Sequence, residues 1–462
     1  MTPIAVFDIG KTNVKLSSVT ADGELLETLS APNLVQDGPP YRHHDLARLE
    51  AWLIGGLSEL AARHEIGAIV TCAHGSGGVL VGPDGPVLPM MDYEQSLPSD
   101  IVDAYRAAAG PYRERGSPIM LGASHLARQM LWQETRWPRD FARATHFLTT
   151  PQYWAWRLSG VAACEVTSLA AQSHLWAAVD NRPARIVAER RWQKLLPPLR
   201  PAWTALGSLK PSLAQVTKLS PATRVLNGIH DSSANFYRYQ AAGLSDFTVV
   251  STGTWIVLLT DRTGVDFDDE RPGHTVNADI RGRPLPGMLS MGGREFSAVA
   301  KDSAGPASAH ELERLLASRT LALPSFGSDD GLFPGSARQG RIEGPLANDM
   351  SARFTLAVLY AALLTAECIE RLPASASIVL DGNFVSDPLY GALVARLLPR
   401  KHVLVSRSTS GTASGAALLA GHETRQAPAP LSAEVPDISA LPDLSPYRAR
   451  WRALTTRMEH VP

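Results

Sequence analysis

Two segments, one in each half of the chain, share a single pattern: an apolar strand, a short turn of glycine and hydroxyl residues, and a second strand. The first covers residues 4–16 and the second covers residues 247–259. Apolar runs on both sides of a glycine turn predict β-hairpins. Glycine permits a tight turn and a close backbone approach, and the turn's N–H groups and hydroxyls can face an anion such as phosphate. The repeated hairpin therefore predicts two related domains that hold one polyphosphate between them.

Length and composition agree with two soluble domains. The chain has 462 residues, which is too long for one ordinary core. Hydrophobic residues make up 45% and charged residues 19%, a balance typical of globular proteins. The net charge of -1 gives no electrostatic footprint for nucleic acid. Cys72, Cys164 and Cys368 form neither a metal-type spacing nor a disulfide framework, which favours a reducing, cytoplasmic location.

No segment favours a membrane. The N-terminus enters a predicted strand at once and leaves no room for a signal peptide. The most apolar helical run, residues 354–371, contains Tyr360, Thr365, Glu367 and Glu370. These polar groups interrupt it too often for a bilayer span, so we expect a buried core helix and no membrane role.

Strand and helix patterns follow one another in both halves, which predicts an α/β protein. The expected strands include residues 67–72, 225–229, 377–380 and 402–406, and the expected helices include 46–64, 232–239, 354–371 and about 447–458. We expect an N-terminal domain over residues 1–240 and a C-terminal, nucleotide-binding domain over residues 241–462.

The turn of the first hairpin, Asp8-Ile9-Gly10-Lys11-Thr12, has a Gly-Lys-Thr sequence but is not a P-loop. That motif requires a glycine where this chain has Ala5, and it leads into a helix, whereas this segment leads into a strand. An ordinary hairpin with Lys11 in solvent is the alternative. Because the pattern occurs twice, we expect both turns to bind phosphate, through Gly10, Lys11, Thr12, Asn13, Gly253 and Thr254.

Asp231 is the candidate general base. It follows an apolar strand and a glycine turn, just ahead of the second hairpin, where a cleft between two domains is expected. A kinase that acts on a sugar hydroxyl needs a carboxylate near that oxygen. The alternative is a helix N-cap. Asp8 and Asp231 are the expected metal ligands for Mg²⁺, held directly or through water; the alternative for Asp8 is a turn-forming role.

Polar groups suited to a polyhydroxyl ligand occur at His74 and Gly75, and again at Asp92 and Gln95. A structural histidine and an exposed loop are the alternatives. Three positions after strands, Gly382, Asn383 and Gly411, fit the flat walls of a nucleotide pocket, or else they are helix-entry turns.

Together and in this order, these segments resemble the FGGY family of carbohydrate kinases, within the actin/hexokinase/Hsp70-like ATPase superfamily. Residues 7–15 are similar to the family's first phosphate motif, 228–234 to its catalytic segment, and 251–255 to its second phosphate motif. The adenosine-side motif resembles residues 381–383, with 411–417 leading the following helix. Residues 150–160, followed by Glu165 and Ser168, are similar to a helical segment of many members.

The resemblance covers nearly the whole chain and implies two ribonuclease H-like (actin-like ATPase) domains with a cleft between them. It implies ATP and Mg²⁺ as cofactors and Asp231 as the base, with His230 beside it on the substrate side. Domain closure would then exclude water from the cleft. A homodimer is one arrangement that the resemblance allows.

The chain departs from the family pattern on the sugar side. Only His74-Gly75 remains of a Gln-x-His-Gly-type motif, and Asp92-Tyr93-Glu94-Gln95 stands where many members have an arginine. The family's Gly-Gly-Gly run is Met291-Gly292-Gly293-Arg294-Glu295 here. The Gly-Lys-Thr-Asn start resembles bacterial kinases of 6-deoxy-ketohexoses such as L-rhamnulose and L-fuculose.

These observations predict an ATP-dependent kinase for a small ketose. Two alternatives stay open: a kinase for another ketopentose or polyol, of the xylulose, ribulose or erythritol type, and a non-catalytic sugar or nucleotide sensor on the same scaffold. A sensor needs no base, so Asp231 argues against it. A chaperone-type or acyl-phosphate-forming ATPase is weakened by the lack of a peptide-binding domain.

Overall fold

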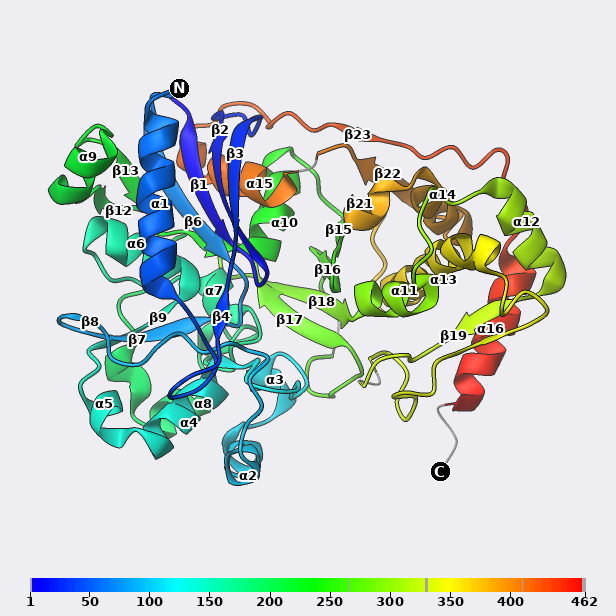
Figure 1. The fold of residues 1–462 in the computed structure, drawn as a ribbon, viewed down its shortest axis with the longest axis horizontal. Helices are drawn as coiled ribbons and strands as arrows, with labels where there is room; N and C mark the ends of the chain where they lie inside the picture. Colours follow the sequence, from blue (N-terminus) through cyan, green and yellow to red (C-terminus); the bar gives the residue numbers. More distant parts are fainter. Residues whose placement is uncertain (1, 265, 329–330, 409, 459–462) are drawn as a thin grey trace.

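The computed structural model describes residues 2–264, 266–328, 331–408 and 410–458. Two α/β halves lie side by side, with the N-terminal half in blue to green and the C-terminal half in green to red (Figure 1). Each half is built on one large sheet, and the elements that join the halves lie between the two sheets.

The first sheet has the strand order β12-β13-β6-β1-β2-β3, with β14 beside β6. β1 pairs antiparallel with β2 and parallel with β6, so the predicted hairpin of residues 4–16 and the strand at 67–72 are confirmed. The strands are β1 (Ile4–Ile9), β2 (Asn13–Val19), β3 (Leu25–Pro32), β6 (Ala68–Ala73), β12 (Ala205–Ser208), β13 (Arg224–Leu226) and β14 (Ile229–His230).

The second sheet has the order β17-β18-β16-β15-β21-β22-β23. β15 pairs antiparallel with β16 and parallel with β21, which confirms the second predicted hairpin. The strands are β15 (Phe247–Thr252), β16 (Ile256–Thr260), β17 (His274–Ala278), β18 (Pro284–Ser290), β21 (Ser377–Gly382), β22 (His402–Ser406) and β23 (Ala433–Glu434).

Both sheets follow one path. Antiparallel strands come first in the chain, three in the first sheet and four in the second, where β17 is the additional one. Two later strands then add in parallel beside the first strand: β3-β2-β1-β6-β13 in one sheet and β18-β16-β15-β21-β22 in the other. The two hairpins therefore occupy equivalent places. The predicted fold class, α/β with two ribonuclease H-like domains, is confirmed.

Helices cover the sheets. Those of the first half are α1 (Leu46–Ala61), α2 (Ser99–Ala108), α3 (Tyr112–Arg115), α4 (Leu126–Arg136), α5 (Pro138–Ala142), α6 (Thr150–Ser159), α7 (Val166–Ala170), α8 (Arg185–Glu189), η1 (Trp192–Leu195), α9 (Pro211–Thr217) and α10 (Asp231–Ala241). Those of the second half are α11 (Gly292–Ala300), α12 (Ala309–Ser318), α13 (Met350–Glu370), η2 (Asn383–Ser386), α14 (Pro388–Leu397), α15 (Gly411–Leu418), η3 (Leu419–Gly421) and α16 (Ser445–Met458).

Short strands complete the fold. They are β4 (Val35–Gln36), β5 (His43–His44), β7 (Gly78–Gly82), β8 (Gly85–Pro86), β9 (His146–Thr149), β10 (Trp176–Ala177) and β11 (Arg182–Pro183) in the first half, and β19 (Leu321–Leu323) and β20 (Arg341–Glu343) in the second.

Local sequence explains α1, the first long helix. Asp45 is its N-cap and its side chain accepts a hydrogen bond from the Arg48 backbone N–H, as N-cap residues do. Leu46, Leu49, Leu53 and Leu57 recur at helical spacing and are buried. The helix predicted at residues 46–64 is thereby confirmed.

The predicted apolar helix is α13. Within the described residues it is the one helix long and apolar enough to cross a bilayer, and almost all of it is buried inside the protein. Its side chains form the centre of the second half's core, which confirms the expectation of a core helix.

The helices α10 and α15 lie between the halves (Figure 1). α15 follows β22 of the second sheet, yet its Ala416 and Ala417 pack in one cluster with Ile4 and Val6 of β1. α10 follows β14 of the first sheet, yet its Phe236 and Tyr239 pack with Phe247 and Val249 of β15. Each half therefore supplies a helix to the other half's sheet, and both helices have their N-terminal ends at the cleft described next.

Candidate active site

Asp231 lies at the first position of α10, directly after β14. The turn before it contains Gly228, whose φ is +89° and whose missing Cβ would lie 2.4 Å from the Thr71 carbonyl oxygen. Only glycine fits that conformation and contact without strain. The alternative interpretation as an N-cap does not hold, because His230 occupies that position and makes no side-chain capping bond.

The two oxygens of the Asp231 carboxylate have different surroundings. Oδ1 accepts from the Ser232 backbone N–H at 2.5 Å and from its hydroxyl at 3.2 Å, and His230 Nε2 lies 3.1 Å away. Among the described residues, no hydrogen bond or ion pair involves Oδ2. Three contacts from two residues therefore orient the carboxylate through one oxygen and leave the other to accept a proton.

A buried chain of hydrogen bonds fixes the backbone next to Asp231. The Glu165 side chain caps α7 and accepts from the Thr167 hydroxyl at 2.6 Å. Thr167 Oγ1 accepts from the His230 backbone N–H at 3.1 Å. Burial lowers the pKa of His230, although Asp231 opposes the shift, so the imidazole is neutral. Glu165 was singled out in the sequence only as part of a helical segment.

Asp8, near the end of β1, and Asp231, directly after β14, lie on either side of β6 in the first sheet. Burial and repulsion from Asp231 raise the pKa of Asp8 to about 7, whereas Lys15 acts in the opposite direction. The negative charge of these two neighbouring carboxylates is not fully balanced by Lys15, so the pair suits a cation. Mg²⁺ typically binds one or two carboxylates together with water and phosphate oxygens. No group of three or more His, Cys, Asp or Glu side chains in the described ranges could hold a metal alone. Asp8 and Asp231 therefore fit Mg²⁺ that also binds phosphate.

A cleft of about 710 Å³ brings Asp231 together with the second hairpin turn. Gly253 lines it from that turn, and Gly382 and Asn383 line it from the end of β21. Gly411 lines it from the start of α15. Five of the residues predicted for catalysis, phosphate and nucleotide thus share one cavity. Ser232 of the 228–234 segment also lines it, as do residues that the sequence did not single out: Asn235, Ser406, Arg407 and Ser408.

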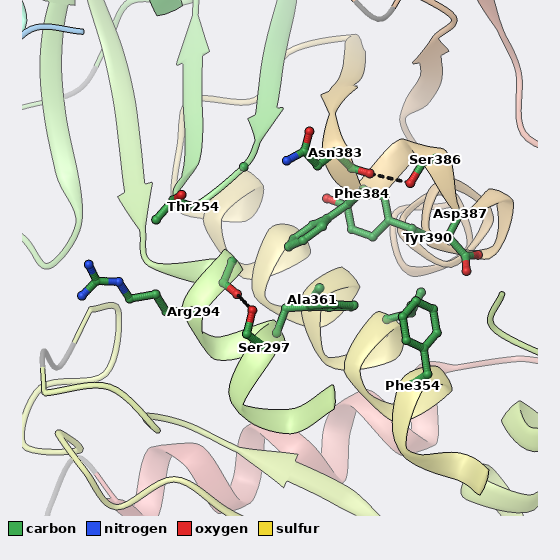
Figure 2. A pocket seen from close by; sticks show the side chains of 14 residues that line it. Thr254, Arg294, Ser297, Phe354, Ala361, Asn383, Phe384, Ser386, Asp387 and Tyr390 are labelled. Atoms are coloured by element: carbon green, nitrogen blue, oxygen red, sulfur yellow. Dashed lines mark hydrogen bonds between the residues drawn. The ribbon is translucent and has the colours of Figure 1, made fainter. Parts of the chain in front are cut away.

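A second cavity, of about 600 Å³, continues from the other side of the same turn (Figure 2). Gly253, Thr254 and Asn383 line it together with Arg294 of α11, Phe354 and Ala361 of α13, and Phe384 and Tyr390. Its apolar and aromatic walls suit a flat heterocycle, with the phosphate turn at its mouth. Only the Gly292-Gly293 pair gave any sequence signal for α11. A Cβ on Gly293 would lie 2.1 Å from the Gly253 carbonyl, so glycine is required there.

In the first hairpin turn, the Gly10 N–H donates to the Asn13 carbonyl, and Asn33 holds the turn from behind through the Gly10 and Thr12 carbonyls. Thr12 and Asn13 are exposed. The Lys11 ammonium pairs with the buried Asp92 carboxylate, lies 3.7 Å from Glu94 Oε2, and sits over the Tyr93 ring. Lys11 is therefore not free in solvent, and its charge is balanced by the 92–94 loop.

His74 lies near Lys11, Asp92 and Asp231, each of which influences its titration. Burial lowers the pKa of His74 to about 4. Its Nδ1 accepts from the Ser76 N–H, so the proton is on Nε2, which is buried and has no hydrogen-bond partner among the described residues. An unpartnered buried donor beside the base is a place for a ligand hydroxyl.

Gln95 and Gly75 have structural contacts instead. Gln95 Oε1 accepts from the Arg42 N–H and its amide donates to the Ser96 carbonyl. Gly75 approaches Ala171 so closely that a Cβ would lie 2.5 Å from the Ala171 side chain. Both residues shape the loops around His74 and Asp92.

Sequence reasoning missed the contacts across the halves, among them one made by the 92–94 loop. Glu94 Oε1 lies 3.1 Å from Arg294 Nη2, so the loop that pairs with Lys11 also contacts α11 of the nucleotide side.

Part of the chain matches a known protein family. Residues 244–429 match the profile of the carbohydrate kinase FGGY C-terminal domain. L-fuculokinase of Escherichia coli (strain K12) is 24% identical over 273 residues, which are 57% of this chain and 57% of that protein. The match thus spans little more than half the length of this curated relative.

Solved structures resemble the whole chain. A carbohydrate kinase from Novosphingobium aromaticivorans is 29% identical, with a TM-score of 0.85 over 99% of both chains. A ligand-bound xylulose kinase from Lactobacillus acidophilus has the same fold, with a TM-score of 0.78, 15% identity and coverage of 99% of this chain and 97% of that one. These comparisons confirm the family resemblance found in the sequence, which the profile match supports over residues 244–429.

Proposed function

We propose that the protein is an ATP-dependent kinase that transfers the γ-phosphate of ATP to a hydroxyl of a small sugar. The observation that carries the proposal is the position of Asp231: its oriented carboxylate lines the same cleft as Gly253 of the second hairpin turn. Asp231 Oδ2 accepts the proton of the sugar hydroxyl as that oxygen attacks the phosphorus in line.

The remaining residues take roles consistent with their places. The aromatic cavity of Figure 2 holds adenine, and the turns at Gly10–Asn13 and Gly253–Thr254 hold the phosphates. Asp8 and Asp231 would hold Mg²⁺, which would supply positive charge to the phosphates. His74 Nε2 donates to a sugar hydroxyl. The two domains, 1–240 and 241–462, then meet at the end of α10, and closure excludes water from the cleft.

For the acceptor we propose a ketose of the L-fuculose or L-rhamnulose type. The support is the Gly-Lys-Thr-Asn start and the similarity to L-fuculokinase. The similarity in fold to a xylulose kinase keeps a ketopentose as the second candidate. We further propose that the enzyme works in the cytoplasm.

ADP release tests the proposal across ketopentoses, ketohexoses, their 6-deoxy forms and polyols. We expect at least one ketose to stimulate ADP release. Asp231→Asn should lower that turnover by ~10²–10⁴-fold, because the general base is lost. Nucleotide binding should be retained, because the phosphate turns are unchanged. The exposed Asp84 is the control: Asp84→Asn removes a carboxylate elsewhere and keeps full turnover.

Two results would count against the proposal. Near-normal turnover of Asp231→Asn would remove the base assignment. Absence of stimulated ADP release with every sugar, despite measurable sugar and nucleotide binding, would favour the sensor.

A further inference from the structure

A third cavity, of about 390 Å³, lies away from the cleft. It is on the C-terminal side of the helices whose N-termini line the cleft. Its walls come from the end of α10 (Tyr237, Gln240, Ala241), the turn between β17 and β18 (Asp279–Arg283), and residues 422–428 beyond η3. α10 begins with Asp231 and α15, which leads into η3, begins with Gly411. The cavity therefore sits at the opposite ends of the two helices whose N-termini line the cleft.

The charges around this cavity do not balance. Asp279 is buried, and its carboxylate is satisfied by Arg283 Nε at 2.7 Å and by two backbone N–H groups. Arg281 is exposed, and its guanidinium makes no hydrogen bond or ion pair within the described ranges. Arg425 donates to the Leu418 carbonyl and to Tyr237 Oη, both uncharged. Two guanidinium groups thus share one cavity without a bound carboxylate.

The other groups that face the cavity are uncharged or oppose an anion only weakly. Burial, Arg281 and Arg425 all lower the pKa of His422, so this imidazole is uncharged, and Tyr237 lies 2.8 Å from its Nδ1. Glu423 opposes this shift; it is exposed and accepts from Trp203 Nε1 at 3.1 Å. The Trp203 and His422 rings pack with centroids 4.2 Å apart.

The last carbonyls of α10, which would repel an anion if they were free, all accept hydrogen bonds. The Ala241 carbonyl accepts from the Ala429 N–H, and those of Arg238, Tyr239 and Gln240 accept from residues 242–244. The C-terminal carbonyls of this helix are therefore occupied, and the local field is set by the two arginines.

We propose that this cavity, which we call the hinge cavity, binds a phosphate group, either as the free ion or as part of a small phosphorylated metabolite. Arg281 and Arg425 would contact its oxygens, since guanidinium groups match phosphate geometry, and Tyr237 and His422 form the floor. The volume suits a small molecule. A ligand there touches the end of α10 and Arg425, which donates to the carbonyl of Leu418 at the end of α15. Its binding is therefore placed to bias the cleft by shifting these helices.

Calorimetric titration tests the hinge cavity directly, with inorganic phosphate, glucose 6-phosphate and glucose as probes of the full chain. We expect both phosphates to bind and glucose not to. Tighter binding of glucose 6-phosphate assigns the site to phosphorylated metabolites, whereas equal binding assigns it to the free ion. The assay needs no turnover, so its outcome is independent of the proposed kinase activity.

Three substitutions give the test a direction. Arg281→Gln should weaken phosphate binding about ten-fold, because a charge-assisted hydrogen bond is lost. Glu423→Gln should strengthen it about two-fold, because an opposing charge is removed. Arg400→Gln, at an exposed arginine outside the cavity, should change nothing. Absence of phosphate binding, or binding equal in wild type and Arg281→Gln, would overturn the proposal, since the cleft would then account for all of it.

Discussion

At the scale of single residues, the pairing of Lys11 with Asp92 is the contact that most changes the interpretation of the first hairpin. Asp92 is fully buried; its cationic partners are Lys11 and, at 3.4 Å, Arg42, and it also accepts from the Glu94 backbone N–H at 3.2 Å. A buried carboxylate that loses a cation keeps its desolvation penalty. Lys11 therefore stabilises the loop that carries Asp92 and Glu94, whatever it contributes to phosphate binding.

We expect Lys11→Met to destabilise the protein by about 1–3 kcal/mol, less than the full loss of a buried pair because Arg42 remains. The double variant Lys11→Met/Asp92→Asn should regain most of that loss, because no unpaired buried charge is left. Urea denaturation measures both. Lys194→Met, at an exposed lysine, is the matched control and should leave stability unchanged. Unchanged stability of Lys11→Met with weakened ATP binding would make Lys11 a phosphate ligand alone.

At the scale of elements, the crossing of α10 and α15 sets the distance between the two halves. Gly415 is at the crossing, where a Cβ would lie 1.9 Å from the Ala234 carbonyl oxygen. No side chain fits there unless one helix moves. Because Asp231 begins α10 and Gly411 begins α15, movement at this crossing displaces both walls of the cleft.

Gly415→Ala should therefore destabilise the protein by about 1–3 kcal/mol through overpacking. Gly55 on α1 offers the matched comparison: it is exposed, nothing lies within 4 Å of its missing Cβ, and Gly55→Ala should stabilise by about 0.5–1 kcal/mol. Thermal unfolding of the two variants compares the same chemical change in opposite surroundings. Equal shifts of the two would show that the crossing tolerates a wider separation.

At the scale of the whole molecule, the elements that a local sequence pattern encodes could be predicted. The contacts between residues far apart in the chain could not. Both hairpins and α1 and α13 follow from apolar spacing and turn residues within a few positions. Lys11 and Asp92 are 81 residues apart, and Glu94 and Arg294 are 200 apart. Neither pair has a local signal, because only the packing of the finished sheets places the residues together. The aromatic wall of the second cavity was missed for the same reason, since its residues come from separate helices.

A stacked histidine pair of the N-terminal half lies next to the contact between the halves and links that contact to pH. The His125 and His174 rings lie 3.6 Å apart and are buried. His125 Nδ1 donates to the Gln172 carbonyl while its Nε2 accepts from the Met120 N–H, an arrangement that only the neutral ring can make. The Gln172 side chain in turn donates to Asn277 of β17, so the pair supports the seam between the halves.

Burial lowers the pKa of His125 to about 3 and that of His174 well below its usual value. Below pH ~6.5 the unfolded chain binds protons at these rings that the folded protein does not, so their contribution to stability is full above that pH and is lost as the pH falls toward ~3. Each ring adds at most about 1.4 kcal/mol per pH unit to the slope of unfolding free energy against pH.

We expect His125→Gln/His174→Gln to make this slope shallower between pH 6.5 and 4.5, whatever its effect on absolute stability. His310→Gln, at an exposed histidine of α12, should leave it unchanged. Urea denaturation across this range measures the slope, and an equal slope in the double variant and the wild type would exclude the pair as a source of acid sensitivity.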